Sequence, residues 1–330
     1  MLALCAVSVL GLAAAQPPNH RTPGAASGAG GKQPERSVSE WLLRLNEASR
    51  QRNYAGTFVV SSAAGALASA RIWHSFEGDL QMERVESLTG APRSTFRRND
   101  EFLTFMPEAK LVRIEKRESP GLFPHLLTST ENSIPQYYSA RVVGRDRVAG
   151  FEAEVVQLVP RDGLRFGYRI WSERKSGLMV KLQTLDTEGG VLEQAAFSEL
   201  QLDAPLRVNK LAQMASTDGY RIERSDVYKT TAAAEGWSLK SVVAGFKSLN
   251  CYKRRSSDNT MQWIFSDGLA SVSLFVEPFD RQRHTQEGLF APLGATQTLT
   301  HRFQDWWVTA VGEVPPETLR AFLQALERQR

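Results

Sequence analysis

Histidine, cysteine and carboxylate side chains carry most catalytic and metal chemistry, and in this chain of 330 residues they show no recognisable spacing. The sequence contains no Gly-x-Ser-x-Gly, His-Glu-x-x-His or Cys-x-x-Cys motif. Residues 24–32 superficially resemble a phosphate-binding loop, but Gln33 stands where the Ser or Thr after Lys32 belongs. The five histidines are scattered: His20, His74, His125, His284 and His301. We therefore expect a binding protein with no enzymatic activity, no cofactor and no bound metal.

Basic and aromatic residues alternate in one stretch, residues 93–117, where Arg97 and Arg113 are interleaved with Phe96, Phe102 and Phe105. Such alternation on strands is typical of a solvated outer face, and it also suits an anionic partner such as a lipid phosphate or an acidic peptide. The formal net charge of only +4 is too small to indicate a nucleic-acid-binding protein.

The N-terminal residues indicate export. Residues 2–15 carry no charge, end in three alanines and are too short to span a bilayer, which needs about 20 apolar residues. This pattern is typical of a cleaved signal peptide, and the Pro-, Gly- and Ala-rich residues 16–36 read as a flexible linker. Cleavage would leave Cys251 as a single cysteine, so we expect no intrachain disulfide. A soluble periplasmic protein is expected.

The next residues predict a helix followed by a large antiparallel sheet. Ser37 and Glu40 form a capping-box pattern, and apolar residues at helical spacing follow up to Tyr54. About ten short β-rich segments then alternate with turn residues over residues 54–116 and 151–200. We expect a first domain over residues 37–205 and a polar, irregular interdomain linker over residues 206–225.

The second domain is predicted over residues 226–330. Strand patterns at 261–266 and 270–277 flank the hairpin signal Asp267-Gly268, and a further strand is expected at 306–311. Two prolines, Pro315 and Pro316, then open a terminal helix. The predicted fold class is α+β, with a large unclosed antiparallel sheet and a smaller second domain.

One or two helices cannot cover a sheet of about ten strands, so the sheet must curl and leave an apolar face for a hydrophobic ligand. Six apolar residues of the first domain are expected to line the cavity and bind acyl chains: Phe58, Ile72, Leu80, Met82, Phe96 and Leu103. In the second domain a small sheet cannot bury every aromatic residue, and exposed aromatic side chains often dominate an interface. The candidate partner-binding residues are Trp263, Phe265, Phe275 and Trp306.

Four stretches in the same order resemble the periplasmic MucB/RseB family. They are YRIW at 168–171 with SGLMVK at 176–181, the Ala244-Gly-Phe246 step, SDGLASVSLFVE at 266–277 and VGEVPP at 311–316. The resemblance covers nearly all of residues 37–328. It implies a first domain similar to lipoprotein carriers of the LolA type, with helices plugging an unclosed barrel.

The resemblance also implies a function. Members of the family bind the periplasmic part of an anti-sigma factor, MucA/RseA in type, and protect it from proteolysis; lipid, lipoprotein or lipopolysaccharide acyl chains are thought to relieve the block. An alternative hypothesis is a lipoprotein-carrier-like protein that binds lipid alone. The second domain argues against it, because such a carrier needs only the first domain. An exported hydrolase is the second rival, disfavoured by the missing nucleophile motif. A homo-oligomer is left open.

Overall fold

The first helix forms where the capping box predicts it. α1 spans Val38–Gln51, and its N-cap Ser37 accepts a hydrogen bond from the Glu40 amide while the Glu40 carboxylate accepts one from the Ser37 amide. Trp41, Leu42 and Leu45 are buried along one face of the helix. The computed structural model describes residues 37–116, 134–224, 227–255 and 259–329. The predicted signal peptide and the linker at 16–36 lie outside these residues.

Residues 36–330 form one compact unit whose described part contains three sheets, of twelve, seven and two strands. We call the large sheet and the helices packed on it the first lobe. Its strands are β1 Tyr54–Ser62, β2 Leu67–Glu77, β3 Leu80–Ser87, β4 Ser94–Arg98, β5 Glu101–Met106, β6 Leu111–Lys116, β7 Tyr138–Val148, β8 Phe151–Pro160, β9 Gly167–Glu173, β10 Met179–Leu185, β11 Val191–Leu202 and β12 Arg221–Arg224. Two short helices, α2 Ile134–Tyr137 and α3 Val208–Gln213, accompany them.

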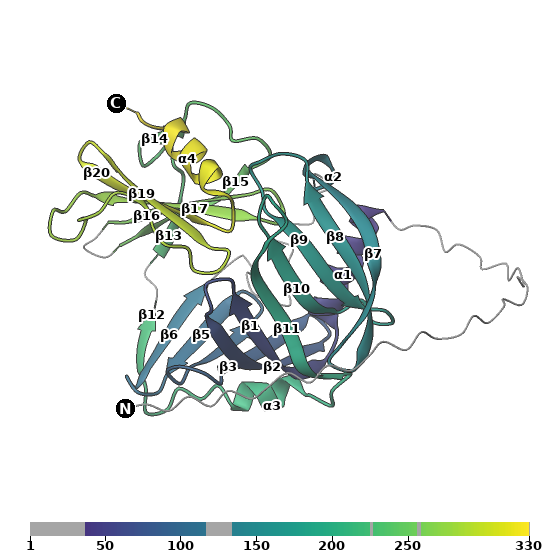
Figure 1. Ribbon diagram of the computed structural model, residues 1–330. Coiled ribbons are helices and arrows are strands. Elements are labelled where there is room, and N and C mark those ends of the chain that lie inside the picture. The colour runs from purple at the N-terminus through teal and green to yellow at the C-terminus, as the bar shows by residue number, and fades with distance from the viewer. Residues whose placement is uncertain (1–36, 117–133, 225–226, 256–258, 330) are drawn as a thin grey trace, which may run out of the picture. The chain divides into compact units, whose positions relative to one another are not determined.

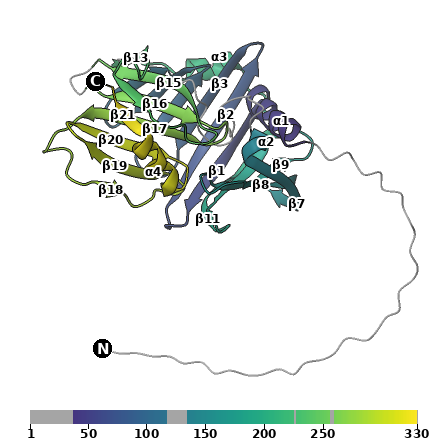
Figure 2. The same cartoon turned by 90° about the horizontal axis from the view of Figure 1, so that it is seen from above.

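The large sheet is an unclosed meander. Its strand order is β12-β6-β5-β4-β3-β2-β1-β11-β10-β9-β8-β7, antiparallel throughout except that β12 pairs parallel with β6. The sheet curls around α1, whose buried face packs on β8, β9 and β10 (Figures 1 and 2). The helix α3 packs on β2 and β3. The α+β class and the unclosed antiparallel sheet are therefore confirmed.

β7 stands at the free end of this sheet and was not predicted. Residues 141–147 of this strand are all exposed and include three arginines, so the strand lacks the apolar alternation by which the other strands were recognised. A bulge interrupts its pairing with β8 between Val142 and Gly144.

The second lobe consists of a seven-stranded sheet, a two-stranded sheet and α4, which spans Pro316–Ala325. Its strands are β13 Val227–Thr230, β14 Trp237–Leu239, β15 Lys247–Arg254, β16 Met261–Ser266, β17 Ser271–Pro278, β18 Gly288–Leu289, β19 Gln297–Phe303, β20 Trp306–Gly312 and β21 Leu326–Arg328. The strand order in the larger sheet is β13-β15-β16-β17-β20-β19-β18. Leu319 and Phe322 of α4 are completely buried against this sheet.

Candidate functional site

The six residues predicted to bind acyl chains lie on two opposite faces of the first sheet. Ile72 pairs with Val85, whereas its neighbour Trp73 pairs with Arg84; because side chains alternate along a strand, the two pairs point to opposite sides. Phe58 and Ile72 belong to a buried cluster with β8 and β10 residues. Met82 and Phe96 belong to a different cluster, against which Leu80 and Leu103 pack.

This second cluster is closed by α3. Val208 and Leu211 of the helix are buried against Met82, Phe96 and Val112. Four of the six predicted residues therefore lie on the face covered by α3. The other two, Phe58 and Ile72, lie on the opposite face, in the buried cluster with residues of β8 and β10. The structure does not bring all six together in one cavity.

The described histidines have ordinary structural partners. His74 is completely buried, stacks on Tyr54 with ring centroids 4.7 Å apart, and its Nδ1 lies 2.7 Å from the Arg52 carbonyl oxygen. Its Nε2 lies 2.9 Å from Nε2 of the Gln81 side chain. His284 and His301 lie close to single glutamates, Glu277 and Glu287. Within the described ranges, no group of His, Cys, Asp and Glu residues could hold a metal ion.

The partner-binding residues predicted in the second lobe divide into core and surface. Trp263 and Phe265 are 9% and 2% exposed, and their rings pack on each other and, for Phe265, on Phe322 of α4. They are core residues because α4 covers their face of the sheet. Phe275 and Trp306 are half-buried, so these two keep a surface that a partner can reach.

A groove runs between α4 and the β18–β19 edge of the second sheet. It encloses about 390 Å³ and is lined by Leu299, Thr300 and His301 of β19 and by Arg320 and Leu323 of α4, among others. The chain beside it exposes the apolar residues Leu289, Phe290 and Leu293. An extended peptide with apolar side chains would find both a groove and an apolar margin here.

A buried arginine joins the two lobes. Arg165 lies in the loop between β8 and β9 of the first lobe and is completely buried. Its Nε donates to the carboxylate of Asp267 at 2.6 Å, and its Nη2 donates to the carbonyl oxygen of Ala244 at 2.6 Å, both in the second lobe. Its Nη1 donates to Asp162 in its own turn. We call these four residues the lobe junction.

Neighbouring groups complete the lobe junction. Asp267 also accepts hydrogen bonds from the Leu269 and Ala270 amides and, at 3.3 Å, from the Tyr138 hydroxyl. Burial raises the pKa of Tyr138 well above its usual range, which keeps the hydroxyl neutral and able to donate. Gly245 has φ +82°, and an added Cβ would collide with the Arg165 guanidinium. Only glycine therefore fits between Ala244 and Phe246.

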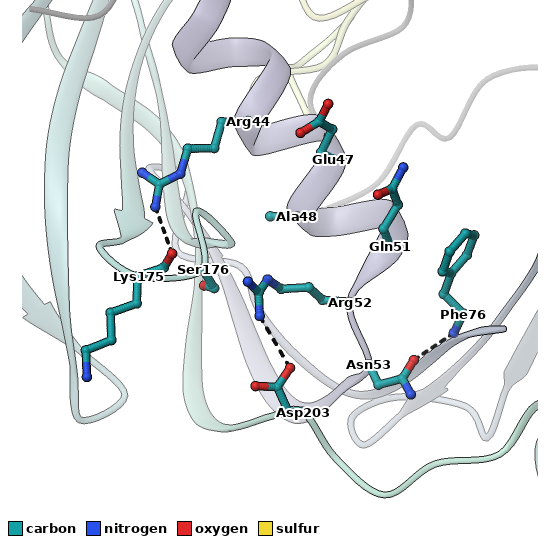
Figure 3. A pocket seen from close by; sticks show the side chains of 10 residues that line it. All are labelled: Arg44, Glu47, Ala48, Gln51, Arg52, Asn53, Phe76, Lys175, Ser176 and Asp203. Carbon is teal, nitrogen blue, oxygen red and sulfur yellow. Dashed lines mark hydrogen bonds and ion pairs between the residues drawn. The ribbon is translucent and has the colours of Figure 1, made fainter. Parts of the chain in front are cut away.

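A polar pocket of about 630 Å³ lies beside the C-terminal half of α1 (Figure 3). Arg44 bridges from the helix to the Lys175 carbonyl oxygen at 2.9 Å, and Arg52 contacts Asp203 at 3.3 Å. The side chain of Asn53 accepts a hydrogen bond from the Phe76 amide. The lining contains both basic residues (Arg44, Arg52 and Lys175) and acidic ones (Glu47 and Asp203), so charge of one sign does not dominate the pocket.

The lobe junction was missed by sequence reasoning, although its signals were present. The stretch around Gly245 was noticed for its family resemblance, Asp267-Gly268 was noticed as a hairpin signal as well, and Arg165 was not singled out. The glycine between Ala244 and Phe246 and the Asp-Gly turn at 267–268 were the available signals. In the described part of the chain, Cys251 is a free, buried cysteine, and burial raises the pKa of its thiol to about 11. No helix among the described residues is long and apolar enough to cross a membrane.

Comparison with known proteins supports the whole architecture. The MucB/RseB N-terminal domain family matches residues 37–215, and the MucB/RseB C-terminal domain family matches residues 231–327. The sigma factor AlgU regulatory protein MucB of Pseudomonas aeruginosa is 31% identical over 84% of this chain and 87% of that protein. The sigma-E factor regulatory protein RseB of Salmonella typhimurium is 26% identical over 87% of this chain and 89% of that protein.

Solved structures agree. The crystal structure of MucB in complex with MucA(peri) superposes with a TM-score of 0.68 and 28% identity, covering 89% of this chain and all of that one. Both domains are matched in the same order as in these relatives, which confirms the resemblance inferred from the sequence motifs. The chain belongs to the MucB/RseB family.

Proposed function

We propose that this chain is a periplasmic regulator that binds the periplasmic segment of an anti-sigma factor and shields it from regulated proteolysis. The observation that carries the proposal is the similarity, over both lobes, to a structure of MucB solved in complex with MucA(peri). The uncharged, alanine-ended residues 2–15 support export. The named relatives are regulatory proteins, which supports a mode of action by binding rather than catalysis.

The second lobe carries most of the affinity for the anti-sigma segment in this proposal. The groove between α4 and β19 supplies apolar and hydrogen-bonding walls, and the half-buried Phe275 and Trp306 keep accessible surface. Trp263 and Phe265 contribute indirectly, because they support the sheet and α4 from the core. Shielding follows when the bound segment is held extended and its cleavage site is out of reach of the protease.

The last part of the proposal is that a lipid relieves the shielding of the anti-sigma segment, which we call lipid relief. An acyl chain bound by the first lobe would stabilise a conformation with lower affinity for the anti-sigma segment. Such a ligand can shift the balance only by the difference between its affinities for the two conformations. The apolar residues named in the first lobe, which include Ile72 in one cluster and Met82 and Phe96 in the other, are the surfaces available for it.

The test is a protection assay with the full chain, the periplasmic domain of the anti-sigma factor encoded in the same genome and the protease that makes its first cut. We expect the chain to slow cleavage strongly, and Arg320→Glu to weaken binding because it reverses the charge in the groove. Arg283→Glu is the matched control, since both arginines are half-exposed and pair with an acid three residues away. Unchanged cleavage with a folded chain would overturn the proposal, and lipid binding without peptide binding would favour the carrier reading.

A further inference from the structure

One stretch of the chain crosses the outer face of the first sheet on its way to the second lobe. We call residues 203–224, which include α3 and β12, the connecting segment. It leaves β11, passes over β2 and β3 as α3, and pairs with β6 as β12 (Figure 1). The first strand of the second lobe, β13, begins only three residues after β12 ends. Movement of this segment would therefore be transmitted directly to the second lobe.

At its C-terminal end the connecting segment is anchored, because β12 pairs along its whole length with β6 and Tyr220 packs edge-to-face on Phe105. The helix α3 makes a smaller set of contacts. α3 has six residues, and helices this short are unstable without tertiary packing. Its N-cap Arg207 makes no side-chain capping hydrogen bond, and the Val208 amide donates instead to the Glu77 carboxylate of β2 at 3.3 Å. Val208 and Leu211 are its buried side chains. The segment begins with the exposed Arg52–Asp203 ion pair and is joined to β2 by the Ser75 hydroxyl, which donates to the Leu206 carbonyl oxygen at 3.3 Å.

The surface beneath the connecting segment is strongly apolar. It presents a continuous set of aliphatic and aromatic side chains from neighbouring strands: Trp73, Leu80, Met82, Phe96, Leu103 and Phe105. If the segment departed, this face would be a large exposed apolar patch of the kind that marks a lipid or ligand surface.

Basic side chains border this patch. The guanidinium groups of Arg71 and Arg84 lie 5.3 Å and 4.8 Å from the centre of the Trp73 ring. Arg84 also touches the connecting segment, because its Nη1 lies 3.6 Å from the Met214 sulfur. Its Nη2 donates to the Glu86 carboxylate at 2.9 Å, whereas its Nε is buried and has no hydrogen-bond partner. An unused donor next to an apolar surface matches the chemistry of a lipid whose anionic headgroup adjoins its acyl chains.

We propose that an anionic acyl lipid binds this face by displacing the connecting segment, with acyl chains taking the place of Val208 and Leu211 and the headgroup bound by Arg84 and Arg71. This inference rests on the proposed lipid relief and specifies its site. Displacing α3 frees the chain that leads into β12 and β13, so lipid binding changes how the second lobe is held. The connecting segment thus acts as a built-in competitor of the lipid.

The experiment measures the reactivity of a cysteine placed under the segment. In a full chain with Cys5 and Cys251 replaced by serine, Leu211→Cys is labelled with a maleimide in the presence of phosphatidylglycerol vesicles or of phosphatidylcholine vesicles. We expect phosphatidylglycerol to raise the labelling rate about tenfold or more, because local opening governs the reactivity of a buried thiol. Phosphatidylcholine should have a much smaller effect.

Two control cysteines separate displacement from other causes. Lys210→Cys is exposed on the same helix and should react equally with and without lipid. Leu274→Cys lies in the core of the second lobe and should stay unreactive unless the chain unfolds. Vesicle flotation of the same samples measures binding: if the chain floats and peptide affinity falls while Leu211→Cys stays unreactive, the displacement inference is wrong and lipid relief stands. If the chain does not float at all, both fail.

A second pair of variants tests the competition. Val208→Asp should weaken the connecting segment and raise affinity for phosphatidylglycerol several-fold, because a closed conformation reduces apparent affinity by the fraction of competent molecules. Asn209→Asp adds the same charge at an exposed position of the same helix, and should leave lipid affinity unchanged. Equal effects from the two variants, or a loss of lipid binding in Val208→Asp with the fold intact by circular dichroism, would overturn the proposal.

Discussion

The two lobes are joined in two physically different ways. The lobe junction uses a completely buried ion pair, Arg165–Asp267, whose donors and acceptors are satisfied from both lobes. In the connecting segment, β12 is fixed by pairing with β6, but α3 is held on the sheet mainly by two aliphatic side chains, Val208 and Leu211, and the segment starts at a solvent-exposed ion pair, Arg52–Asp203. Removing one partner of a buried ion pair leaves the other charge buried without compensation, so this connection opens only at a large cost in free energy. A small apolar contact, in contrast, can open and be replaced by other apolar groups. The lobe junction is therefore the stiff connection, and the α3 contact is the one that another apolar group could replace.

The largest expected effect comes from breaking the lobe junction. Asp267→Ala leaves the Arg165 guanidinium buried without its carboxylate and should lower the free energy of unfolding by about 3–5 kcal/mol. Urea denaturation measures it. The double variant Arg165→Met/Asp267→Leu removes both charges and should recover much of the loss. If Asp267→Ala costs no more than an exposed control such as Asp305→Ala, the junction is not the stiff connection.

The next effect tests the close approach at Gly245. Gly245→Ala should cost about 3 kcal/mol, because alanine is strained at positive φ and its Cβ displaces Arg165. Gly219→Ala is the matched control: Gly219 has φ +79° with open space around its Cβ position, so it isolates the backbone strain. Thermal melting of the two variants should differ clearly, and equal melting temperatures would contradict the steric part of the argument.

A smaller effect is expected in the connecting segment. Leu211→Ala should cost about 2 kcal/mol, at the low end for such truncations, because the segment can open locally without unfolding the sheet. Hydrogen exchange should quicken at the β12 amides while amides of β9 and β10 keep their protection. Lys210→Ala, exposed on the same helix, serves as the reference. Faster exchange throughout the first lobe would show that the segment is not separable.

The smallest effect belongs to the ion pair at the start of the segment. Arg52→Ala should change the free energy of unfolding by less than about 1 kcal/mol, since exposed ion pairs contribute little and are screened by salt. The backbone carbonyl of residue 52, which lies beside His74, is retained in the variant. A loss comparable to that of Asp267→Ala would remove the contrast between the two connections.

Most of the fold follows from local sequence patterns. Predicted strands at 80–87 and 261–266 coincide with β3 and β16, and the capping box places α1 correctly. Strands whose side chains are mostly polar or half-exposed, such as β7 and β15, carry no apolar alternation and were missed. The linker expected at 206–225 contains α3 and β12, because Val208 and Leu211 find an apolar face that local sequence does not reveal.

The functional surfaces were harder to predict than the strands. Assigning six apolar residues to one cavity required knowing which way each strand faces, and the alternation that separates Ile72 from Met82 depends on register across the β2–β3 hairpin. The lobe junction joins residues 79 and 102 positions apart. No periodicity links such residues, and the signals that mark the place are Gly245 and the Asp-Gly turn at 267–268.

An unclosed sheet has two ends that could add strands from other molecules, and this chain treats the two differently. At one end the edge strand is β12, which has only four residues, three of them charged. The other, β7, presents Arg141, Arg145 and Arg147 to solvent and is bent by the bulge near Gly144. Charge and a bulge on an edge strand oppose edge-to-edge association. The sheet can thereby remain open at this end without recruiting the edge strand of a second molecule.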